Sequence, residues 1–409
     1  SYNFKPIRNN NKNFTLNQRI HFYKRGIHMK KILLILAVAL LLEIPSVYAT
    51  DETENVEINT EDIILSQMDE LNVSNFITKS KEYSGEFMED IDIGELLQSA
   101  ISGNINNDTF FKKIVNLFGK EIKSTIKILG SILIIIIIHS ILKSISDGLE
   151  NKSISTITYY VQYILIVTLI MSNFADIISL TKQSIQNMLG YGQTLVPLLM
   201  TLLLTTGSIT SAGVIEPIIL FLINFISNML EVFIIPMVLI STAIGIISKV
   251  SEEVHIDKIS KFMKSSIVWL LGITLTLFVS VVSIDGSLTS SVDGITAKTT
   301  KAAVSNLIPV VGKILGDTVD TVIGCSNILK NAVGIVGIIV IIAICIGPII
   351  KLTILTLSYH LVAAISQPIA DAKIVKLLDE MGETFKLLLG IMSAIAVMLI
   401  IGTTLVIKI

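Results

Sequence analysis

The sequence predicts an all-α, polytopic helical membrane protein with about eight transmembrane helices and a central amphipathic helical hairpin. The first observation is composition: of 409 residues, 52% are hydrophobic and 16% are charged, whereas charged residues make up about a quarter of a soluble globular protein. The second is a mean hydropathy of +0.75. The third is a series of apolar runs of about 20 residues, the length that crosses ~30 Å of hydrocarbon. Together these observations exclude an ordinary soluble domain.

The front of the chain has the order of an exported protein. Residues 1–28 are basic, rich in asparagine and without apolar periodicity, so we interpret them as an upstream leader outside the mature protein. Residues 29–49 follow the pattern of a secretory signal peptide: two lysines, an apolar run over 32–42 and a small residue at Ala49. We expect cleavage between Ala49 and Thr50. The alternative, an uncleaved first transmembrane helix, requires a longer apolar run.

The next two segments are amphipathic. Residues 50–109 are acidic, and a cleaved signal would place them outside the cytoplasm. Their apolar spacing predicts one or two short helices, so we expect a small, mobile prefix and not an independent domain. Residues 110–129 set aromatic and aliphatic side chains against lysines. This pattern is typical of a helix lying in the membrane interface, and it also fits a helix packed on the bundle.

Residues 110–409 form the predicted polytopic membrane domain. Its apolar runs cover residues 126–145, 157–178, 194–209, 214–247, 265–283, 333–350 and 385–407. The run at 214–247 is too long for one span, so we predict two short helices divided near residues 228–231. With that division and an outside N-terminus, the lysine-rich loop at 249–264 faces the cytoplasm, as the positive-inside rule favours.

Residues 283–334 form a central segment that is more polar than its neighbours and faces the extracytoplasmic side in this topology. Two amphipathic helical patterns flank an interruption, because proline disfavours a helical conformation at the residue before it. The predicted hairpin break comprises Asn306, Pro309 and Gly312. The hairpin either lies flat on the membrane or enters it as a re-entrant element, which needs protein or a water-filled cavity around it.

The second arm of this hairpin carries the candidate functional face. Lys313, Asp317, Asp320 and Asn327 recur at helical spacing on its polar side. Lys313 and Asp317 are one turn apart, the spacing of an intrahelical ion pair. One interpretation is that this face lines a conduit or contacts another subunit. The other is that it is the solvated face of a surface helix.

The sequence contains no enzymatic signature, so we expect a protein that is not an enzyme. Gly312 and Lys313 lack the Ser or Thr that follows Gly-Lys in a phosphate-binding loop. The five histidines lack metal-ligand spacing. No cofactor is expected, and a net charge of -2 without a basic patch gives no sign of nucleic-acid binding.

Four ionisable residues lie inside or beside the predicted spans, where charge is costly and often functional. Asp176, Glu216 and Glu231 fit interfacial positions at helix ends. His139 follows five isoleucines, and an interhelical hydrogen bond would explain it. Further on, Gln367-Pro368 predicts a helix break. The amphipathic helix after it, which we interpret as a cytoplasmic interface or a partner helix, sets Ile374, Leu377 and Leu378 against Lys373, Lys376, Asp379 and Glu380.

Four motifs resemble sequences of a known family. They are SVDGITAK at 291–298, NLIPVVG at 306–312, the stretch from Asp317 to Asp320, and SQPIAD at 366–371. With the signal peptide, the acidic prefix and the spans, the chain resembles the stage III sporulation protein AE family of endospore-forming bacteria. The resemblance covers about residues 29–409.

The resemblance implies a non-enzymatic integral-membrane subunit of a multi-protein, secretion-like channel between mother cell and forespore. It implies a role in sporulation and in forespore gene expression after engulfment. The expected partners are membrane lipid and other subunits of the stage III sporulation complex: ring-forming proteins, an ATPase and small membrane proteins. Self-association into a homo-oligomer is a further option. The expected location is the mother-cell-derived membrane around the forespore, with the N-terminal region in the intermembrane space. The alternatives are a stand-alone small-molecule permease and a structural anchor for assembly.

Overall fold

The computed structural model describes residues 60–104, 108–147, 152–250, 256–281 and 312–408. The chain divides into two units, Ser1–Glu57 and Ile58–Ile409, and every described residue belongs to the second. The leader, the signal peptide with its Ala49–Thr50 cleavage site, and the hairpin break at Asn306 and Pro309 lie outside the described residues. They stay predictions.

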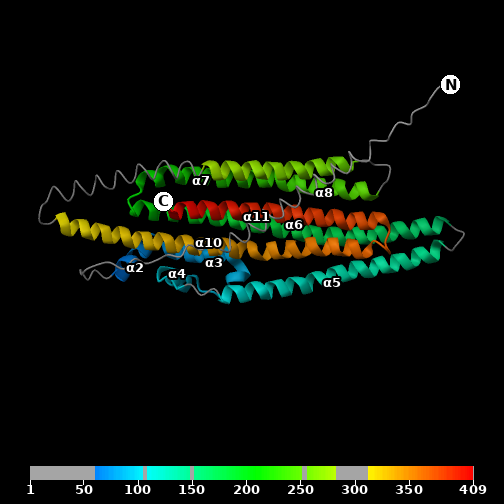
Figure 1. The fold of residues 1–409 in the computed structure, drawn as a ribbon, viewed down its shortest axis with the longest axis horizontal. Coiled ribbons are helices and arrows are strands. Elements are labelled where there is room, and N and C mark those ends of the chain that lie inside the picture. The colour runs from blue at the N-terminus through cyan, green and yellow to red at the C-terminus, as the bar shows by residue number, and fades with distance from the viewer. Residues whose placement is uncertain (1–59, 105–107, 148–151, 251–255, 282–311, 409) are drawn as a thin grey trace, which may run out of the picture. The chain divides into compact units, whose positions relative to one another are not determined.

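Every regular element within the described ranges is helical, which confirms the all-α prediction (Figure 1). In chain order the elements are α2 (Thr60–Glu70), α3 (Val73–Ser84), the 3₁₀ turn η1 (Gly85–Met88), α4 (Ile93–Ile101), α5 (Asp108–Asp147), α6 (Lys152–Thr205), α7 (Ile209–Met229), the π-helical turn η2 (Leu230–Ile234), α8 (Ile235–Val250), the helix Asp257–Val281, α10 (Gly312–Ser366) and α11 (Ala372–Lys408).

Five helical segments of the described chain are long and apolar enough to cross a membrane. They are Tyr163–Thr205, Ile209–Lys249, Asp257–Val281, Val319–Ser366 and Ala372–Lys408. The prediction of about eight spans and a re-entrant hairpin is not confirmed. Four of the five segments have 37 to 48 residues, whereas about 20 residues cross the hydrocarbon core. Most of these helices are therefore longer than the core is thick.

Helix α6 joins two spans that we predicted to be separate. It runs from Lys152 to Thr205 through the polar interval that follows residue 178 and through the internal Pro197. Buried Ile185, Met188 and Tyr191 continue its packed face across that interval. The prediction was wrong because it used bilayer thickness to end the helix, whereas packing on neighbouring helices sustains it.

The predicted division near residues 228–231 is a π-helical turn and not a chain reversal. The helix continues from Ile209 to Lys249, with η2 at Leu230–Ile234. Pro236 follows this turn directly, and proline lacks an N–H and clashes with the preceding turn of an α-helix. Widening to π geometry, with the Ile235 N–H bonded to the Leu230 carbonyl, relieves that clash. The predicted topology placed the lysine-rich loop at 249–264 in the cytoplasm only if the chain reversed near residues 228–231. Without that reversal, the lysine positions no longer support this topology.

The acidic prefix forms three short helices that pack on the long ones, although we expected it to be mobile. Phe76 and Tyr83 of α3 lie against Tyr191 of α6, with ring centroids 6.3 and 6.1 Å apart, respectively. In η1 and α4, Met88 and Leu97 are fully buried. The amphipathic spacing was recognised correctly, and the apolar faces it defines are buried against the bundle.

The predicted interfacial helix at 110–129 is the first half of α5. Phe111 and Phe118 on this half are exposed. Lys113 and Lys120 form ion pairs with Asp90 (3.3 Å) and Glu86 (3.0 Å) of the prefix. This half of α5 therefore packs on the prefix and also presents an apolar surface, so both interpretations of the segment retain support.

Helix α10 contains the second arm of the predicted hairpin. It begins at Gly312 and continues without interruption to Ser366, so that arm and the predicted span at 333–350 are one helix. The break at Gln367-Pro368 is confirmed: α10 ends at Ser366 and α11 begins at Ala372. The carboxylate of Asp371 accepts a hydrogen bond from the Lys373 N–H at 2.9 Å, as an N-terminal cap does.

Helices α10 and α11 pack along each other and form the centre of the described bundle (Figure 1). Gly334 of α10 lets the side chain of Ile407 lie against its backbone, and Gly337 does the same for Leu195 of α6. Small residues at such crossings let apolar helices approach closely.

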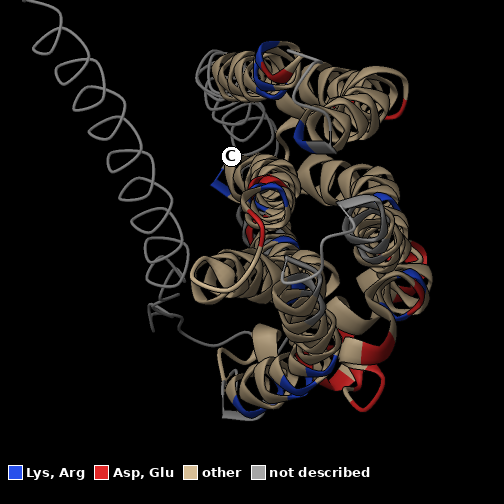
Figure 2. Cartoon of the chain, turned by 90° about the vertical axis from the view of Figure 1, so that its right-hand side faces the viewer, with Lys and Arg blue, Asp and Glu red and all other residues tan. Residues whose placement is uncertain are grey.

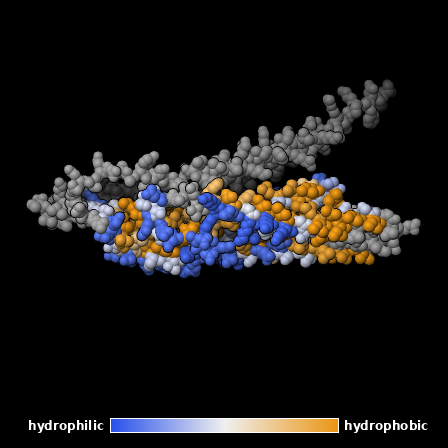
Figure 3. Space-filling model, turned by 90° about the horizontal axis from the view of Figure 1, so that it is seen from below, coloured by the Kyte–Doolittle hydropathy of each residue, from blue (hydrophilic) through white to orange (hydrophobic). Residues whose placement is uncertain are grey.

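The surface of the described bundle is strongly divided by polarity. Figure 3 shows hydrophilic residues over much of one face and hydrophobic residues gathered where α5 ends and α6 begins. In the last part of α5 and the first part of α6, the exposed apolar side chains are Ile134, Ile137, Ile138, Ile141, Ile145, Ile157, Val161, Ile164 and Leu165. Lysines and acids are grouped in a few patches, and most of the ribbon carries neither (Figure 2).

Candidate functional site

The structure leaves the predicted conduit face largely untested. Lys313, Asp317, Asp320 and Asn327 all lie in α10, so helical periodicity is maintained between them. Asp320 is exposed and Asn327 is half-buried, while the side chains of Lys313 and Asp317 are outside the described set. Gly312 is the first residue of α10 and does not stand at a described break. The conduit role of this face stays a prediction.

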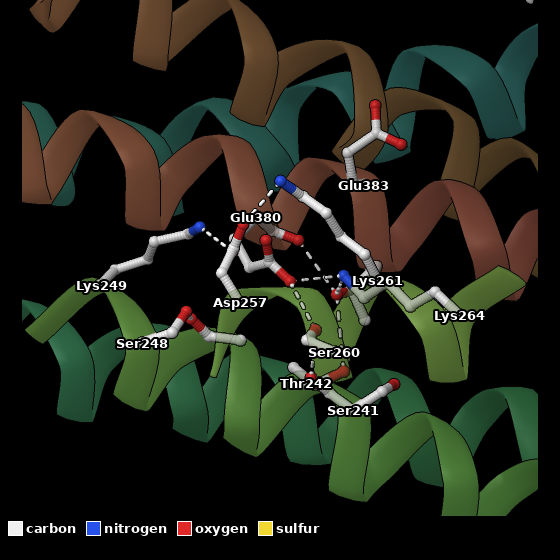
Figure 4. A network of polar contacts seen from close by, with 12 residues as sticks. Ser241, Thr242, Ser248, Lys249, Asp257, Ser260, Lys261, Lys264, Glu380 and Glu383 are labelled. Carbon is white, nitrogen blue, oxygen red and sulfur yellow. Dashed lines mark hydrogen bonds and ion pairs between the residues drawn. The ribbon is translucent and has the colours of Figure 1, made fainter. Parts of the chain in front are cut away.

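A different polar cluster lies between three of the candidate membrane-spanning segments. Figure 4 shows Lys264, from the helix Asp257–Val281, beside Glu380 of α11. Their Nζ and Oε1 atoms are 2.7 Å apart, and the two side chains are 15% and 11% exposed. Lys264 also donates to the Thr384 hydroxyl at 2.9 Å. The ammonium therefore has a charged and a neutral acceptor on successive turns of α11.

Helix α8 completes this cluster. The Ser260 hydroxyl donates to the Ser241 carbonyl at 2.7 Å and lies 3.4 Å from the Glu380 carboxylate. The Thr242 hydroxyl is 2.7 Å from the Val238 carbonyl of its own helix and 3.4 Å from Thr384. These contacts link α8, the helix Asp257–Val281 and α11 through side chains that are mostly buried (Figure 4).

Helical spacing and one glycine create this arrangement. Ser260 and Lys264 are four residues apart, as are Glu380 and Thr384, so each pair shares one helix face. Gly245 of α8 lies directly against the Glu380 carboxylate: a Cβ at this position would come within 2.8 Å of its Cδ atom. Because Gly245 has no side chain, the Glu380 carboxylate fits between the helices at this position.

A second ion-pair group adjoins the first. Asp257 pairs with Lys249 from the end of α8 and, at 2.6 Å, with Lys261 one turn further along its own helix. Asp257 is about one-third exposed, and Lys261 is 70% exposed. This group therefore ties the two helices at a solvent-accessible edge, where such pairs contribute about 1 kcal/mol or less.

A third group joins α10 to α11. His360 Nδ1 lies 2.6 Å from Asp379, and its Nε2 lies 3.7 Å from Glu383. Glu383 also pairs with Lys386 at 3.0 Å. The imidazole packs on Gly382, where a Cβ would meet the ring at 2.9 Å. The imidazole therefore lies between two carboxylates of α11 and links that helix to α10.

The arrangement is suited to holding helices together. A buried ion pair costs several kcal/mol of desolvation per ion, and good geometry with further hydrogen bonds is needed to offset that cost. Lys264 and Glu380 have such geometry. Of the residues that the structure describes, no group of three or more His, Cys, Asp or Glu side chains is arranged to hold a metal ion.

Sequence reasoning missed this cluster for two reasons. It treated Lys264 as a loop lysine and Glu380 as part of an exposed face, although Ile374, Leu377 and Leu378 on the opposite face are buried as predicted. The repeated polar spacing Ser260–Lys264 and Glu380–Thr384, beside apolar runs, was the available signal. Which helices face each other cannot be derived from one sequence.

The ionisable residues noted in the spans have varied positions. Asp176 is exposed in the interior of α6, not at a helix end as we expected. Glu216 is half-buried within α7. Glu231, in the π-helical turn, accepts a hydrogen bond from Gln186 of α6 at 2.5 Å. The side chain of His139 lies beyond the described set, so its role stays open.

Comparison with known proteins supports the family resemblance directly. Residues 91–409 match the family described as stage III sporulation protein AE. The stage III sporulation protein AE of Bacillus subtilis (strain 168) is 30% identical over 335 residues, which cover 79% of this chain and 84% of that protein. No solved structure matches the chain. The chain belongs to the stage III sporulation protein AE family.

Proposed function

We propose that this chain is a non-enzymatic integral-membrane subunit of a multi-protein, secretion-like channel that links mother cell and forespore. Membership of a stage III sporulation family supports the sporulation role. Five long apolar helices support the membrane location. The proposal includes a requirement for forespore gene expression after engulfment, with the ring-forming proteins, the ATPase and the small membrane proteins of the complex as partners.

The observation that carries the proposal is the Lys264–Glu380 ion pair between two candidate membrane-spanning helices. Both charges are satisfied within one chain, by each other and by Thr384. A pair of this kind fixes how two helices face each other. We therefore assign the cluster a positioning role: it sets the arrangement of α8, the helix Asp257–Val281 and α11 on which the subunit's contacts depend.

The placement in the cell is also a proposal. The signal-like sequence at 29–49 would put the acidic prefix in the intermembrane space and the remainder in the mother-cell-derived membrane. The polar face of α10 with Lys313, Asp317 and Asp320 would then line the conduit or contact another subunit. Its support is the helical spacing of these residues.

A complementation experiment tests the subunit function. Sporulating cells that lack their own copy of the protein would express the full chain, the Lys264→Met or Glu380→Gln variant, or the exchanged pair Lys264→Glu with Glu380→Lys. We expect the single variants to lower spore counts and a forespore reporter at least tenfold, and the exchanged pair to recover part of both. Normal forespore expression in the complete absence of the chain would contradict the proposal.

The same cells distinguish the alternatives. Asp317→Asn with Asp320→Asn should leave complex assembly intact and reduce forespore expression if this face lines the conduit. Normal assembly together with normal sporulation would refute the conduit role. Solute uptake by the purified chain alone in liposomes would instead support a stand-alone permease.

A further inference from the structure

One face of helix α6 changes from apolar to polar partway along the helix. Near the start of α6 the exposed side chains on this face are Ile157, Val161, Ile164 and Leu165. From residue 172 to residue 193 every exposed side chain except Ala175 is polar, and these residues recur at helical spacing within the candidate membrane-spanning segment Tyr163–Thr205. They are Ser172, Asp176, Ser179, Lys182, Gln183, Gln186 and Gln193, and we call them the α6 stripe.

The stripe continues onto the neighbouring segments α7 and η2. Gln193 donates a hydrogen bond to the Asn224 side chain at 2.9 Å, and Gln186 donates to Glu231 at 2.5 Å. All four of these side chains are exposed. The polar groups of the adjoining helices therefore form one hydrogen-bonding surface, which extends ~25 Å along α6 at 1.5 Å per residue.

Contacts with α11 place the stripe beside a stretch that has the composition and length of a membrane span. From Leu387 to Ile407, α11 contains no charged residue. Helices α6 and α11 lie side by side (Figure 1). Phe174 lies against Phe385 with ring centroids 6.3 Å apart, and a Cβ on Gly192 would come within 3.1 Å of the Leu399 side chain. Residues 174–192 of α6 therefore lie beside residues 385–399 of α11.

The helix Asp257–Val281 presents the opposite chemistry at the same depth. Lys264 donates to Thr384, and the Phe278 ring lies against Gly402, so residues 264–278 adjoin nearly the same part of α11. The large exposed side chains after Lys264 are Val268, Trp269 and Leu277, and no charged residue follows Lys264 in this helix. This side of the bundle has the composition of a surface in contact with lipid.

Lipid is an unfavourable surrounding for the α6 stripe. Hydrocarbon offers no hydrogen-bond partner, and a charged side chain at the centre of a bilayer costs at least ~2.5–3.5 kcal/mol. Ionisable residues in membrane helices accordingly face the protein interior or a water-filled cavity. A dry contact with another subunit also fits poorly, because the core of such an interface is depleted of charge and rich in large apolar side chains. The stripe has a lysine and an aspartate and no large apolar residue, so water fits it best.

We propose that the α6 stripe lines a water-filled path across the membrane, while the helix Asp257–Val281 faces lipid at the same depth. The inference rests on the proposed function in one respect: the path is the conduit of the channel. Its wall combines amides with charges of both signs, Lys182 and Glu231 among them. The path therefore suits hydrophilic solutes and does not select them by the sign of their charge.

Paired cysteine substitutions test the two sides of the bundle. Gln183→Cys and Ser179→Cys are on the stripe, and Val268→Cys and Thr276→Cys are on the helix Asp257–Val281. Each is placed in the full chain without Cys325 and Cys345, in permeabilised membrane vesicles from sporulating cells. A charged, water-soluble maleimide should label the stripe positions at least about tenfold faster, because the reactive thiolate forms in water and not in hydrocarbon.

Two results would overturn the proposal. Equally fast labelling on both sides would place this depth outside the bilayer, and equal protection on both sides would mean that protein or lipid covers the stripe. Labelling after denaturation verifies that each cysteine is present. The nearly isosteric pair Ser179→Cys and Thr276→Cys remains decisive if another variant does not fold. The parent chain, whose Cys325 and Cys345 are 2% and 4% exposed, can carry the substitutions if the cysteine-free chain does not fold.

This experiment and the complementation experiment fail separately. A chain that forespore expression requires, but that labels equally on both sides, would refute the water-filled path alone. Selective labelling of the stripe, together with normal forespore expression in the absence of the chain, would refute the proposed function while the water-facing stripe stands.

Discussion

At the scale of single residues, the most consequential contact is the ion pair between Lys264 and Glu380. Removing one partner of a buried pair leaves the other charge without compensation, which costs ~3–5 kcal/mol. Since both side chains here keep a little exposure, we expect Glu380→Gln to destabilise the protein by about 3 kcal/mol. Thermal unfolding in detergent, followed by the fluorescence of the single tryptophan, measures this.

The matched control is Lys386→Met, which breaks the exposed pair with Glu383 and should cost less than about 1 kcal/mol. Replacing both Lys264 and Glu380 by methionine should recover most of the stability lost in Glu380→Gln, because no buried charge remains. Equal losses of stability in Glu380→Gln and Lys386→Met would show that the buried pair contributes no more to stability than the exposed one.

Gly245 offers an independent test of the same carboxylate. In Gly245→Ala the new methyl group would occupy the space of the Glu380 carboxylate, so that side chain must move away from Lys264. We expect a destabilisation of about 1–3 kcal/mol, the usual range for overpacking. Gly213→Ala in α7 is the control: no atom lies within 4 Å of its added Cβ, and alanine favours a helix by ~1 kcal/mol over glycine. The two substitutions should therefore shift the unfolding temperature in opposite directions.

At the scale of elements, the packed prefix leads to a prediction about α3. Phe76 is 2% exposed beside Tyr191, and truncating a buried phenylalanine costs ~3–5 kcal/mol. Because α2–α4 are short, Phe76→Ala should detach the prefix and leave the long helices folded. Limited proteolysis should then cut within residues 60–104 at least tenfold faster, whereas Phe111→Ala, at a residue that is 69% exposed, should change little. Unchanged cleavage in Phe76→Ala would mean that the prefix is held elsewhere.

The elements also show what one sequence can and cannot specify. The break at Gln367-Pro368 and the buried face of Ile374 and Leu377 were predictable, because proline chemistry and helical periodicity are local. The continuity of α6 and the π-helical turn before Pro236 were not. Both depend on packing between distant segments, as does the pairing of Lys264 with Glu380. Family membership was predictable because it rests on motifs and not on contacts.

At the scale of the whole molecule, helix length and bilayer thickness disagree. Helix α10 has 55 residues and so extends ~80 Å, against ~30 Å of hydrocarbon. Tilt does not remove this difference, since membrane helices are tilted by about 20° on average. The charged groups around Glu380 and Asp379 lie within the same bundle. Placing them in hydrocarbon would be costly, so an aqueous surrounding is the more favourable one for them. We conclude that the bundle extends beyond the membrane on at least one side.

Cysteine accessibility along α10 tests this conclusion. In a variant without Cys325 and Cys345, single cysteines replace Val319 or Ile365, which are 53% and 51% exposed. These positions are 46 residues apart in one helix, or ~69 Å, so both cannot lie in the hydrocarbon of one bilayer. We expect a water-soluble maleimide to label at least one of them in permeabilised membrane vesicles within minutes. If both positions resisted labelling in vesicles yet reacted after denaturation, α10 would have to be broken or covered by partner subunits, and the uninterrupted exposed helix would be wrong.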